Sequence, residues 1–387
     1  MTTINLTFLG TSSAQPSATR NHQCIALRLD GDIWLFDAGE ASQHQLQRSQ
    51  LRMGKIEKVF VTHMHGDHCF GLPPLLCTMT NSNPSASNEA PKPPIEIFGP
   101  STLRRWLRST LKLTRSTLGR QYTVHELLLP TDPIDSGDPT DPDNPLHHNE
   151  ILGRNILIDT ANNAWSVLTT DKWSVIAAPI VHSIPSLGYV LTEHPIPGKI
   201  DIVTIQPLLA RNKDALLREQ GVKNPMALLR TVQSGKDLHL PDGTVVLAPK
   251  PRPGRRIVIL GDTSDPSLIA PHARDADLVV HEATNAKTFL DPPELTYEEA
   301  ERNAISHGHS TPQMAGRWAR GVNARRLVLT HFSARYKGDD GGEEGAQGEG
   351  PRVMEEIRRL AVETFGEERD GEVFCARDFW SVDVPRT

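Results

Sequence analysis

The sequence predicts an α/β fold, and three observations support this class. The chain has 387 residues, of which 37% are apolar, so it is long enough to bury a sizeable core. Its first part contains closely spaced strand-like segments, and its second part alternates strands with helices, which is typical of α/β domains. Several of these strands end in a His or an Asp. Side chains at strand ends can meet at one edge of a sheet, so we expect a functional site there.

The first hundred residues contain short apolar runs separated by turn-forming residues, as strands do. The dipeptide Asp30-Gly31 favours a tight hairpin between two of these runs. A further run leads directly into His63 and reads as a buried strand. We expect strands at residues 4–9, 24–29, 33–36, 56–62 and 95–98, followed by a basic amphipathic helix at residues 103–118.

Four apolar runs in the later part of the chain each lead into a residue that can bind a metal ion or a proton. Strands of this kind alternate with at least one helical segment, which favours a second sheet covered by helices. We expect these strands at residues 173–181 before His182, 257–260 before Gly261-Asp262, 278–280 before His281 and 327–330 before His331, with a helix at residues 311–320.

Three segments have the composition of surface loops. Residues 78–94 are rich in Asn, Ser and Pro, residues 130–150 in Pro and Asp, and residues 337–350 in Gly and Glu. These compositions disfavour packed structure. We therefore expect a single domain over residues 1–387, with loop insertions at 78–94 and 130–150.

The composition also excludes several classes of protein. No apolar run approaches the roughly 20 residues that cross a bilayer, and the start MTTINLTFLG has neither the charge nor the apolar stretch of a signal peptide. The four cysteines form no close-spaced pair, so a disulfide framework is not expected. We expect no membrane partner and a cytoplasmic location, with nuclear entry left open.

The strongest single signal is the sequence Thr62-His63-Met64-His65-Gly66-Asp67-His68. Three imidazoles and a carboxylate within six residues cannot all be core residues. A turn after a strand can direct His63 and His65 to one side and Asp67 and His68 to another. Imidazole and carboxylate ligands suit zinc, and this arrangement suits a pair of ions in a hydrolytic site.

The chain resembles the metallo-β-lactamase superfamily through this HxHxDH motif, and more specifically the short form of ribonuclease Z, the tRNA 3′-processing endonuclease. The motif alone is typical of the superfamily, whereas HEAT, HST and HxSxRY are typical of the ribonuclease Z branch. The motifs that carry the resemblance are FLGTSSAQPSATRN, FDAGEASQHQ, VTHMHGDHCFGLP, HSIPSLGY, GDTS, HEAT, HGHST and THFSARY.

The resemblance implies a metallo-β-lactamase αβ/βα sandwich with a protruding basic arm and two Zn2+ ions per subunit. It implies that both ions are held by side chains from several loops. One zinc would take His63, His65 and His182, the second would take Asp67, His68 and His331, and Asp262 would bridge both.

The resemblance also implies catalytic roles for three residues in cleavage of precursor tRNA. Asp67 would orient the attacking water, and Glu282 of HEAT with His309 of HST would protonate the leaving 3′-oxygen. The products would be a tRNA with a 3′-OH and a trailer with a 5′-phosphate. His281 and His307 are expected to be structural or to support the ligands.

A basic segment lies between the His182 and Asp262 motifs. Residues 199–256 contain eleven Lys or Arg and five Asp or Glu, a local net charge of +6 in a chain whose net charge is −6. Such a segment localises phosphate contacts, although an ordinary solvated face remains an alternative. Ribonuclease Z carries its tRNA-binding arm in this interval, so the resemblance implies an inserted arm at residues 193–256.

Five residues are candidates for substrate binding. The arm of the family contains a Gly-Pro element near its tip, and the nearest match here is Lys223-Asn224-Pro225. Asn tolerates left-handed backbone angles, so the turn could survive the loss of Gly. Arg20 and Arg335 lie in family loops near the active site. Because each motif occurs once, the chain resembles the homodimeric short form, in which one subunit's arm holds tRNA for the other subunit's site.

Alternative functions remain at this stage. A related phosphodiesterase or arylsulfatase acting on small substrates would share the metal site but should lack a basic arm and the Glu–His pair. An inactive RNA-binding scaffold would have lost ligands, whereas all seven are present. A β-lactamase or thioesterase would leave HEAT, HST and the arm unexplained.

Overall fold

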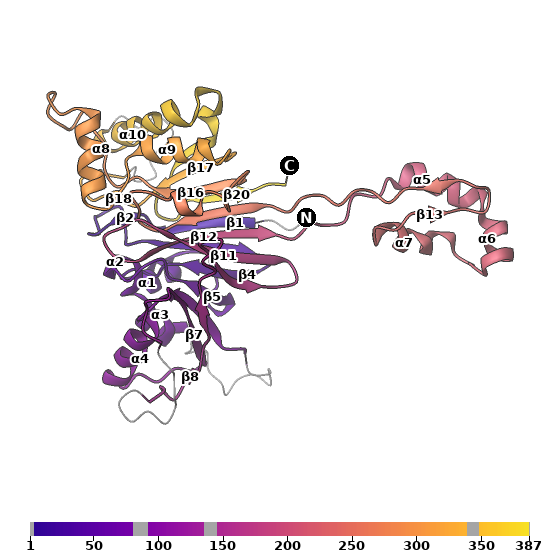
Figure 1. The fold of residues 1–387 in the computed structure, drawn as a ribbon, viewed down its shortest axis with the longest axis horizontal. Helices are drawn as coiled ribbons and strands as arrows, with labels where there is room; N and C mark the ends of the chain where they lie inside the picture. Colours follow the sequence, from indigo (N-terminus) through magenta and orange to yellow (C-terminus); the bar gives the residue numbers. More distant parts are fainter. Residues whose placement is uncertain (1–3, 80–91, 135–144, 339–347, 387) are drawn as a thin grey trace. The chain divides into compact units, whose positions relative to one another are not determined.

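The computed structural model describes residues 4–79, 92–134, 145–338 and 348–386. The chain forms two compact units (Figure 1). The larger unit contains Met1–Thr170, Ser174–Leu191 and Arg256–Thr387, and the smaller contains Asp171–Trp173 and Thr192–Arg255. In the described part of the chain, none of the helices combines the length and the apolar character that crossing a membrane requires.

The first sheet of the larger unit joins strands from the beginning of the chain to its last strand. Its order is β20-β1-β3-β4-β5-β6-β7-β8, and β9 also pairs with β7. Pairing is antiparallel from β20 to β4 and parallel from β4 onward. The strands are β1 Ile4–Gly10, β3 Cys24–Leu29, β4 Asp32–Phe36, β5 Ile56–Phe60, β6 Ile95–Pro100, β7 Tyr122–Leu128, β8 Glu150–Ile151, β9 Asn155–Leu157 and β20 Ser381–Val384.

The second sheet contains the later strands in the order β10-β11-β12-β15-β16-β17-β19. The pairs β15–β16, β16–β17 and β17–β19 are parallel, so their carboxyl ends share one edge. A short parallel pair, β2 (Ser12–Ser13) with β18 (Phe332–Ser333), lies apart from both sheets. The strands of the second sheet are β10 Trp165–Thr169, β11 Trp173–Ile180, β12 Ser186–Glu193, β15 Arg256–Leu260, β16 Leu278–Glu282, β17 Leu327–Thr330 and β19 Val373–Cys375.

Helices cover the outer face of each sheet in the larger unit (Figure 1). Leu35, Val59 and Ile97 of the first sheet belong to one buried cluster with apolar side chains of its helices, and the second sheet shares another cluster with α9 and α10. The helices are α1 Ser42–Arg48, α3 Leu72–Met79 and α4 Leu103–Leu113 on the first sheet, and α9 Pro312–Gly321 and α10 Glu349–Phe365 on the second.

An aromatic core lies between the two sheets. Phe36, Phe60 and Phe98 follow Leu35, Val59 and Ile97 in three adjacent strands, so they point to the opposite face of the first sheet. Phe60 stacks on Phe36 and Phe98 with ring centroids 4.9 and 5.1 Å apart. Tyr189 of the second sheet meets Phe36 and Phe60 edge-on. The layer order is therefore helix, sheet, sheet, helix.

Tyr189 also fixes the backbone close to the predicted site, because its hydroxyl donates a hydrogen bond to the carbonyl of Val61 (2.8 Å). That residue follows β5 and precedes the HxHxDH motif. The loop that carries the motif is thus held by both sheets.

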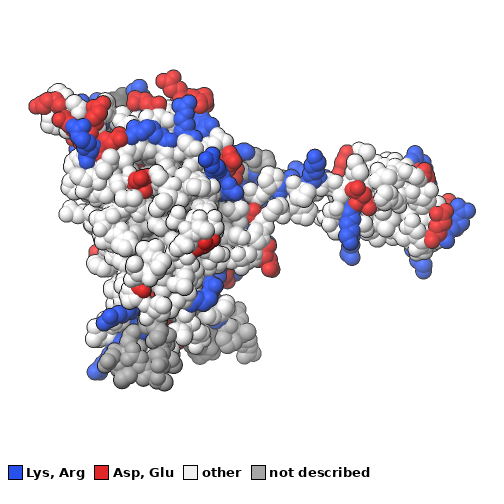
Figure 2. Space-filling model, viewed as in Figure 1, with Lys and Arg blue, Asp and Glu red and all other residues white. Residues whose placement is uncertain are grey.

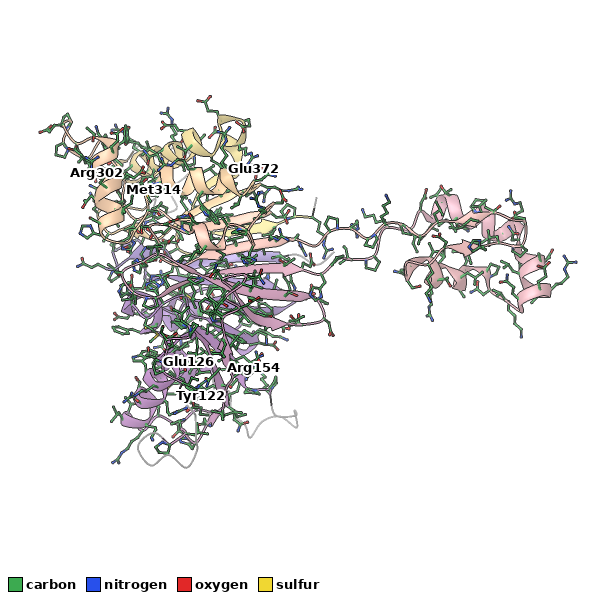
Figure 3. All side chains as sticks on the ribbon, in the orientation of Figure 1. Tyr122, Glu126, Arg154, Arg302, Met314 and Glu372 are labelled. Atoms are coloured by element: carbon green, nitrogen blue, oxygen red, sulfur yellow. The ribbon has the colours of Figure 1, made fainter. Side chains whose placement is uncertain are left out.

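Helix α4 buries two arginines as well as leucines. Arg108 forms a two-pronged ion pair with Glu150, with Nε–Oε2 and Nη2–Oε1 distances of 2.8 Å each. Arg104 lies 3.6 Å from Glu126 of β7, a residue that Figure 3 labels. The helix was predicted to reach residue 118, which is wrong: it ends at Leu113 because Arg115 adopts a left-handed backbone angle (φ 51°).

The other predicted strands and the hairpin at Asp30-Gly31 are confirmed, with ends that shift by one or two residues. The loop predictions at 78–94, 130–150 and 337–350 lie partly outside the described residues, which leave out 80–91, 135–144 and 339–347. At their described ends, Met79 belongs to α3 and Gly350 to α10, and Glu150 begins β8.

The smaller unit has its own apolar core. Ile205 and Leu209 of α5 meet Leu216 of α6 and Val232 of α7 in a buried cluster. At its two chain connections, Arg255 pairs with Glu193 (Nε–Oε2 2.9 Å). The elements of this unit are α5 Ile202–Arg211, α6 Lys213–Gln220, a 3-10 helix at Pro225–Leu228, α7 Leu229–Gln233, β13 Leu238–His239 and β14 Val245–Val246.

Candidate active site

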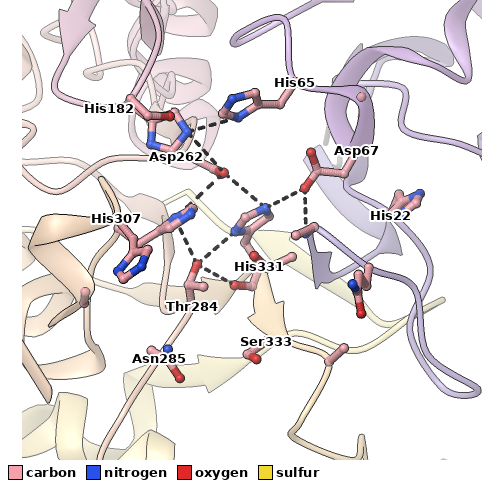
Figure 4. A pocket seen from close by; sticks show the side chains of 18 of the residues that line it. His22, His65, Asp67, His182, Asp262, Thr284, Asn285, His307, His331 and Ser333 are labelled. Atoms are coloured by element: carbon pink, nitrogen blue, oxygen red, sulfur yellow. Dashed lines mark hydrogen bonds and ion pairs between the residues drawn. The ribbon is translucent and has the colours of Figure 1, made fainter.

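Polar residues that follow strands of both sheets meet at one cavity of about 870 Å3 in the larger unit (Figure 4). The carboxyl ends of parallel strands face the same edge of a sheet, which is why residues distant in sequence converge here. The seven predicted metal ligands all lie at this edge: His63 and His65 follow β5, Asp67 and His68 lie in the short helix α2 (Gly66–Cys69), His182 follows β11, Asp262 follows β15 and His331 follows β17.

Four of these side chains form a first group of potential ligand atoms, all within 4.8 Å of one another: His63, His65, His182 and Asp262. Nδ1 of His65 lies 3.2 Å from Nε2 of His63 and 3.2 Å from Nε2 of His182. Asp262 Oδ2 lies 3.7 Å from Nε2 of His63. The three nitrogens and the oxygen thus surround a common point.

A second group contains Asp67, His68, His331 and again Asp262, with the same 4.8 Å limit. The Nε2 atoms of His68 and His331 are 3.1 Å apart. Asp262 Oδ1 lies 3.4 Å from Nε2 of His68, and Asp67 Oδ2 lies 3.3 Å from Nε2 of His331. Asp262 therefore belongs to both groups, one carboxylate between two sets of donors.

The chemistry of these donors fits divalent metal ions. His63, His68, Asp262 and His331 are almost completely buried, and burying so many polar groups is costly unless they are paired or coordinate a metal. Imidazole nitrogens with carboxylate oxygens are ligands suited to zinc. The residues that are present fit a pair of such ions.

The pKa shifts of three histidines in the site are also consistent with binding of positively charged metal ions. Burial lowers the pKa of His63 well below its ordinary value and also lowers the pKa of His65, which favours the neutral form that binds metal. Burial opposes a charge on His68 as well, but the carboxylates of Asp262 and Asp37 raise the pKa of His68 well above its ordinary value. The centre of the site therefore attracts positive charge.

Hydrogen bonds from outside the cluster orient the ligands. Nδ1 of His68 donates to Asp37 (2.7 Å), which also accepts from the backbone N–H of Thr62. Nδ1 of His182 donates to the carbonyl of Gly308 (2.7 Å). In both cases the bond to Nδ1 directs Nε2 toward the cluster, as outer partners of metal-binding histidines commonly do.

His309 of the predicted Glu282–His309 pair lines the same cavity. Glu282 is buried at the end of β16, and its Oε1 lies 3.0 Å from Nδ1 of His309. Its carboxylate also accepts hydrogen bonds from the backbone N–H groups of Thr263 (2.7 Å) and Ser310 (3.2 Å) and from the hydroxyl of Thr284. Glu282 is thus fixed, and the imidazole of His309 has one nitrogen held and Nε2 available to a substrate.

Thr284 links this pair to the metal-ligand cluster. Its hydroxyl lies 3.0 Å from Nδ1 of His331 and 3.3 Å from Nδ1 of His309 (Figure 4). Although burial works to lower the pKa of His309, the hydrogen bond and charge of Glu282 raise it to about 9. His309 is therefore suited to carry a proton at neutral pH, as a general acid must.

Four residues of this site were not assigned roles from the sequence. Asp37 and Thr284 lie within the quoted FDAGEASQHQ and HEAT motifs, so the motifs themselves carried a signal for them. Gly308 acts only through its carbonyl, which no residue pattern reveals. His22 is buried, lines the cavity and has no hydrogen-bond partner for either ring nitrogen among the described residues.

The two remaining motif histidines differ in position. His281 is fully buried in β16, where its Nδ1 donates to the carbonyl of Glu282 (2.8 Å). His307 lines the cavity, and its Nδ1 donates to the carbonyl of Asn303 (2.8 Å). His281 therefore lies outside the cavity, whereas His307 is open to it.

Two of the predicted substrate-binding residues are engaged with the protein itself. The side chain of Arg20 is buried and donates to Thr11 (2.7 Å) and to the carbonyl of Ala376 (2.9 Å). Arg335 forms an ion pair with Asp291 (2.6 Å). Neither residue lines the cavity, so their role in substrate binding stays a prediction without a supporting contact.

The predicted arm-tip residues lie in the smaller unit, where Lys223 and Asn224 are exposed. Asn224 is extended (φ −119°), and its side chain accepts a hydrogen bond from the backbone N–H of Met226 at the start of the 3-10 helix. Asn224 is therefore not in the left-handed conformation that its residue type would tolerate. The left-handed residue in this turn is Gly221 (φ 67°).

Comparisons with known proteins give relatives over almost the whole chain. Residues 4–127 match the family model described as "Anti-Pycsar protein Apyc1". "Zinc phosphodiesterase ELAC protein 1" of Bos taurus is 37% identical, with 99% of each chain covered. "Ribonuclease Z" of Geobacillus kaustophilus is 34% identical over 87% of this chain and 90% of its own.

Solved structures agree with these relatives. Human tRNase Z, short form, superposes with a TM-score of 0.61 at 31% identity and covers 98% of this chain and 99% of its own. YhfI of Bacillus subtilis, a metallo-β-lactamase fold protein, has a TM-score of 0.54 at 14% identity over 98% and 99% of the two chains, which speaks for the fold alone. The predicted αβ/βα sandwich is thereby confirmed.

Proposed function

The chain belongs to the ribonuclease Z family, and from this premise we propose that it is a metal-dependent endoribonuclease that removes the 3′ trailer from precursor tRNA. The tRNA would keep a 3′-OH and the trailer a 5′-phosphate. The observation that carries the proposal is that His309, held by Glu282, lines the same cavity as five of the seven potential metal ligands and lies within 4.8 Å of the donor atom of His331. Simple binding of metal would not require a fixed acid beside the ligands.

The test is cleavage of a defined substrate by the purified protein. A tRNA precursor with a 3′ extension is incubated with the enzyme, with and without a chelator, and the cut is mapped at nucleotide resolution. We expect one cut, at the junction of the tRNA and its 3′ trailer. The chelator should abolish this cleavage and Zn2+ should restore it. Random degradation, or cleavage that persists after metal removal, would reject the proposal.

We propose two Zn2+ per subunit. His63, His65 and His182 would hold one ion, Asp67, His68 and His331 would hold the other, and Asp262 would contact both. When bound, such ions lower the pKa of a coordinated water and offset charge on phosphoryl oxygens. Elemental analysis of the isolated protein should give two zinc ions per chain, and Asp262→Ala should reduce this number.

The protein's own residues would supply the proton transfers. Asp67 would accept a hydrogen bond from the attacking water, and its Oδ2 is itself held by the backbone N–H of Ala14 (2.7 Å). As the new bond to phosphorus forms, the bond from phosphorus to the 3′-oxygen breaks. His309 would donate its proton to that oxygen, so the tRNA leaves with a 3′-OH and the phosphate remains on the trailer.

We further propose that the basic segment 193–256 is the arm that binds tRNA. Figure 2 shows Lys and Arg side chains on the smaller unit, among fewer acidic ones. In this unit Lys223 is exposed, and the segment carries a local net charge of +5, from eleven Lys or Arg and six Asp or Glu. Removal of residues 193–256 should raise the KM for precursor tRNA steeply and spare hydrolysis of bis(p-nitrophenyl) phosphate. Equal loss of both activities would show that the segment is needed for the fold of the site.

A point variant tests the arm without deletion. Lys223→Ala should weaken tRNA binding. If Lys223 contacts a phosphate, the plot of the logarithm of the tRNA association constant against the logarithm of salt concentration should also become less steep, by about 1. Lys92→Ala, which removes an exposed lysine of the larger unit that does not line the cavity, is the matched control. An unchanged slope in Lys223→Ala would remove this residue from the interface.

The family resemblance also supports a homodimer in which the arm of one subunit serves the site of the other. Mixed subunits test this directly: one variant lacks residues 193–256 and the other carries Asp262→Ala. Each variant assayed by itself should be inactive on precursor tRNA, and the mixture of the two variants should regain activity. A mixture that stays inactive, although the two chains associate, would exclude transfer between subunits.

The alternatives are less well supported. A phosphodiesterase or arylsulfatase for small substrates would need neither the Glu282–His309 pair nor a basic segment. An inactive RNA-binding scaffold is difficult to reconcile with seven intact ligands. A cytoplasmic location remains a prediction from the sequence, to be checked by fractionation.

A further inference from the structure

Phe70 is an exposed aromatic residue at the candidate active site. Its side chain is 58% exposed although it is large and apolar. Among the residues that line the cavity in the described part of the chain, it is the one Phe, Tyr or Trp. Single exposed apolar residues are common on protein surfaces, so the position of this ring needs further evidence before a function is inferred.

The ring of Phe70 is held in place by its neighbours. A Cβ atom added to Gly66 would lie only 2.4–2.8 Å from three atoms of the ring, so the ring rests directly over the glycine. Trp106 of α4 is a more distant neighbour, with ring centroids 6.4 Å apart and planes inclined by 22°. Because 58% of its side chain is exposed, the ring still presents surface to a ligand.

The backbone of Phe70 is equally fixed. Its N–H donates to the carbonyl of Gly66 (2.9 Å), and the next residue, Gly71, donates to the carbonyl of Ala38 (2.9 Å). A Cβ on Gly71 would lie 1.9 Å from the carbonyl oxygen of Gly39, so this packing is close. Phe70 thus follows the ligands Asp67 and His68 on a rigid turn.

We infer that Phe70 is a stacking platform for one of the two bases that flank the scissile phosphate. The inference rests on the proposed cleavage of precursor tRNA. The nucleotides on either side of the cut are single-stranded, and single-stranded bases bind exposed aromatic rings by stacking. A base stacked on a rigid ring three residues from Asp67 would place its phosphate beside the metal ligands, which is how orientation contributes to rate.

The experiment compares Phe70→Ala, Phe70→Leu and Phe70→Trp with the control Phe289→Ala, which removes a similarly exposed Phe (44%) that does not line the cavity. We expect kcat/KM for precursor tRNA to fall about 5- to 150-fold in Phe70→Ala, the range typical of losing one stacked base. Phe70→Leu should behave like Phe70→Ala, because it keeps an apolar group but no ring face. Phe70→Trp should retain most of the activity, and the zinc content of all variants should be unchanged.

Precursors with an abasic site distinguish stacking from a structural role. One substrate lacks the base of the last tRNA nucleotide and another lacks that of the first trailer nucleotide. One of them should be a poor substrate for the unmodified enzyme and should show no additional loss with Phe70→Ala. Additive losses with both substrates, an active Phe70→Ala, or a loss of bound zinc would each overturn the inference. Failure of the unmodified enzyme to cut any precursor would instead reject the proposed function.

Discussion

Replacement of Glu282 by Gln tests the proposed general acid most directly. Glu282 holds His309 through a 3.0 Å contact to Nδ1, and its charge is a main cause of the raised pKa of that imidazole. Gln keeps the size of the side chain and one oxygen for the backbone N–H of Thr263. The substitution therefore removes the charge while it leaves the shape of the site largely intact.

The size of the effect follows from the pKa of His309. With a pKa of about 9, roughly nine tenths of His309 is protonated at pH 8; at the ordinary histidine value of about 6.5, only about 3% would be. Glu282→Gln should therefore slow precursor cleavage about 30-fold at pH 8 and less than about twofold at pH 6. Since the acid form is the active one, the unmodified enzyme should lose activity as the pH rises through about 9.

The assay is single-turnover cleavage of precursor tRNA from pH 6 to pH 9, with hydrolysis of bis(p-nitrophenyl) phosphate measured in parallel. The p-nitrophenolate group leaves without a proton, so this second activity should survive in Glu282→Gln. Glu298→Gln, an exposed acid at the start of α8 (Tyr297–Ser306), is the control. A loss that is the same at every pH, or the same for both substrates, would refute the role of Glu282.

Three further predictions concern the support of the site and the fold. Asp37→Asn should weaken metal binding by about 10- to 100-fold, as loss of an outer partner of a ligand does, and chelator competition measures this; unchanged affinity would contradict the proposed orientation of the ligand by Asp37. Gly308→Ala should impair metal binding and activity, because Gly308 has φ +79° and a Cβ there would lie 2.8 Å from Nδ1 of His182. The zinc content measured by elemental analysis should therefore fall in Gly308→Ala. It should stay unchanged in the control Gly371→Ala, which has open space around it. Arg108→Ala should lower the free energy of unfolding by about 3–5 kcal/mol, since it leaves a buried carboxylate unpaired; chemical denaturation would detect this, and a change below 1 kcal/mol would show that the pair is solvated.

The sequence predicted the candidate metal-binding residues better than the hydrogen-bond partners that orient them. His63, His65, Asp67 and His68 were recognisable because four metal-binding residues in six positions are incompatible with a core. A distant candidate ligand such as His331 carried no local signal beyond its position after a strand, and only the family motifs linked it to the others. The structure brings it to 3.1 Å from His68.

Interactions that join distant residues through hydrogen bonds were not predictable from composition. Glu150 stood at the end of a Pro/Asp-rich stretch, yet it is buried against Arg108, 42 positions earlier. The predicted helix extended beyond the end of α4 because the spacing of apolar residues gives no information about the left-handed backbone angle at Arg115. The fold class and the strand positions, by contrast, follow from hydrophobic patterns that each segment carries by itself.

The pairing of β1 with β20 has a consequence for the synthesis of this nuclease. Thr7 lies against Ser381, 374 positions later, and the sheet that carries the HxHxDH loop is completed only by that late strand. A polypeptide still growing on the ribosome has this early motif but neither its closing strand nor, for most of translation, His331. The candidate metal site, and with it any cleavage of RNA, would thus be complete only near the end of translation.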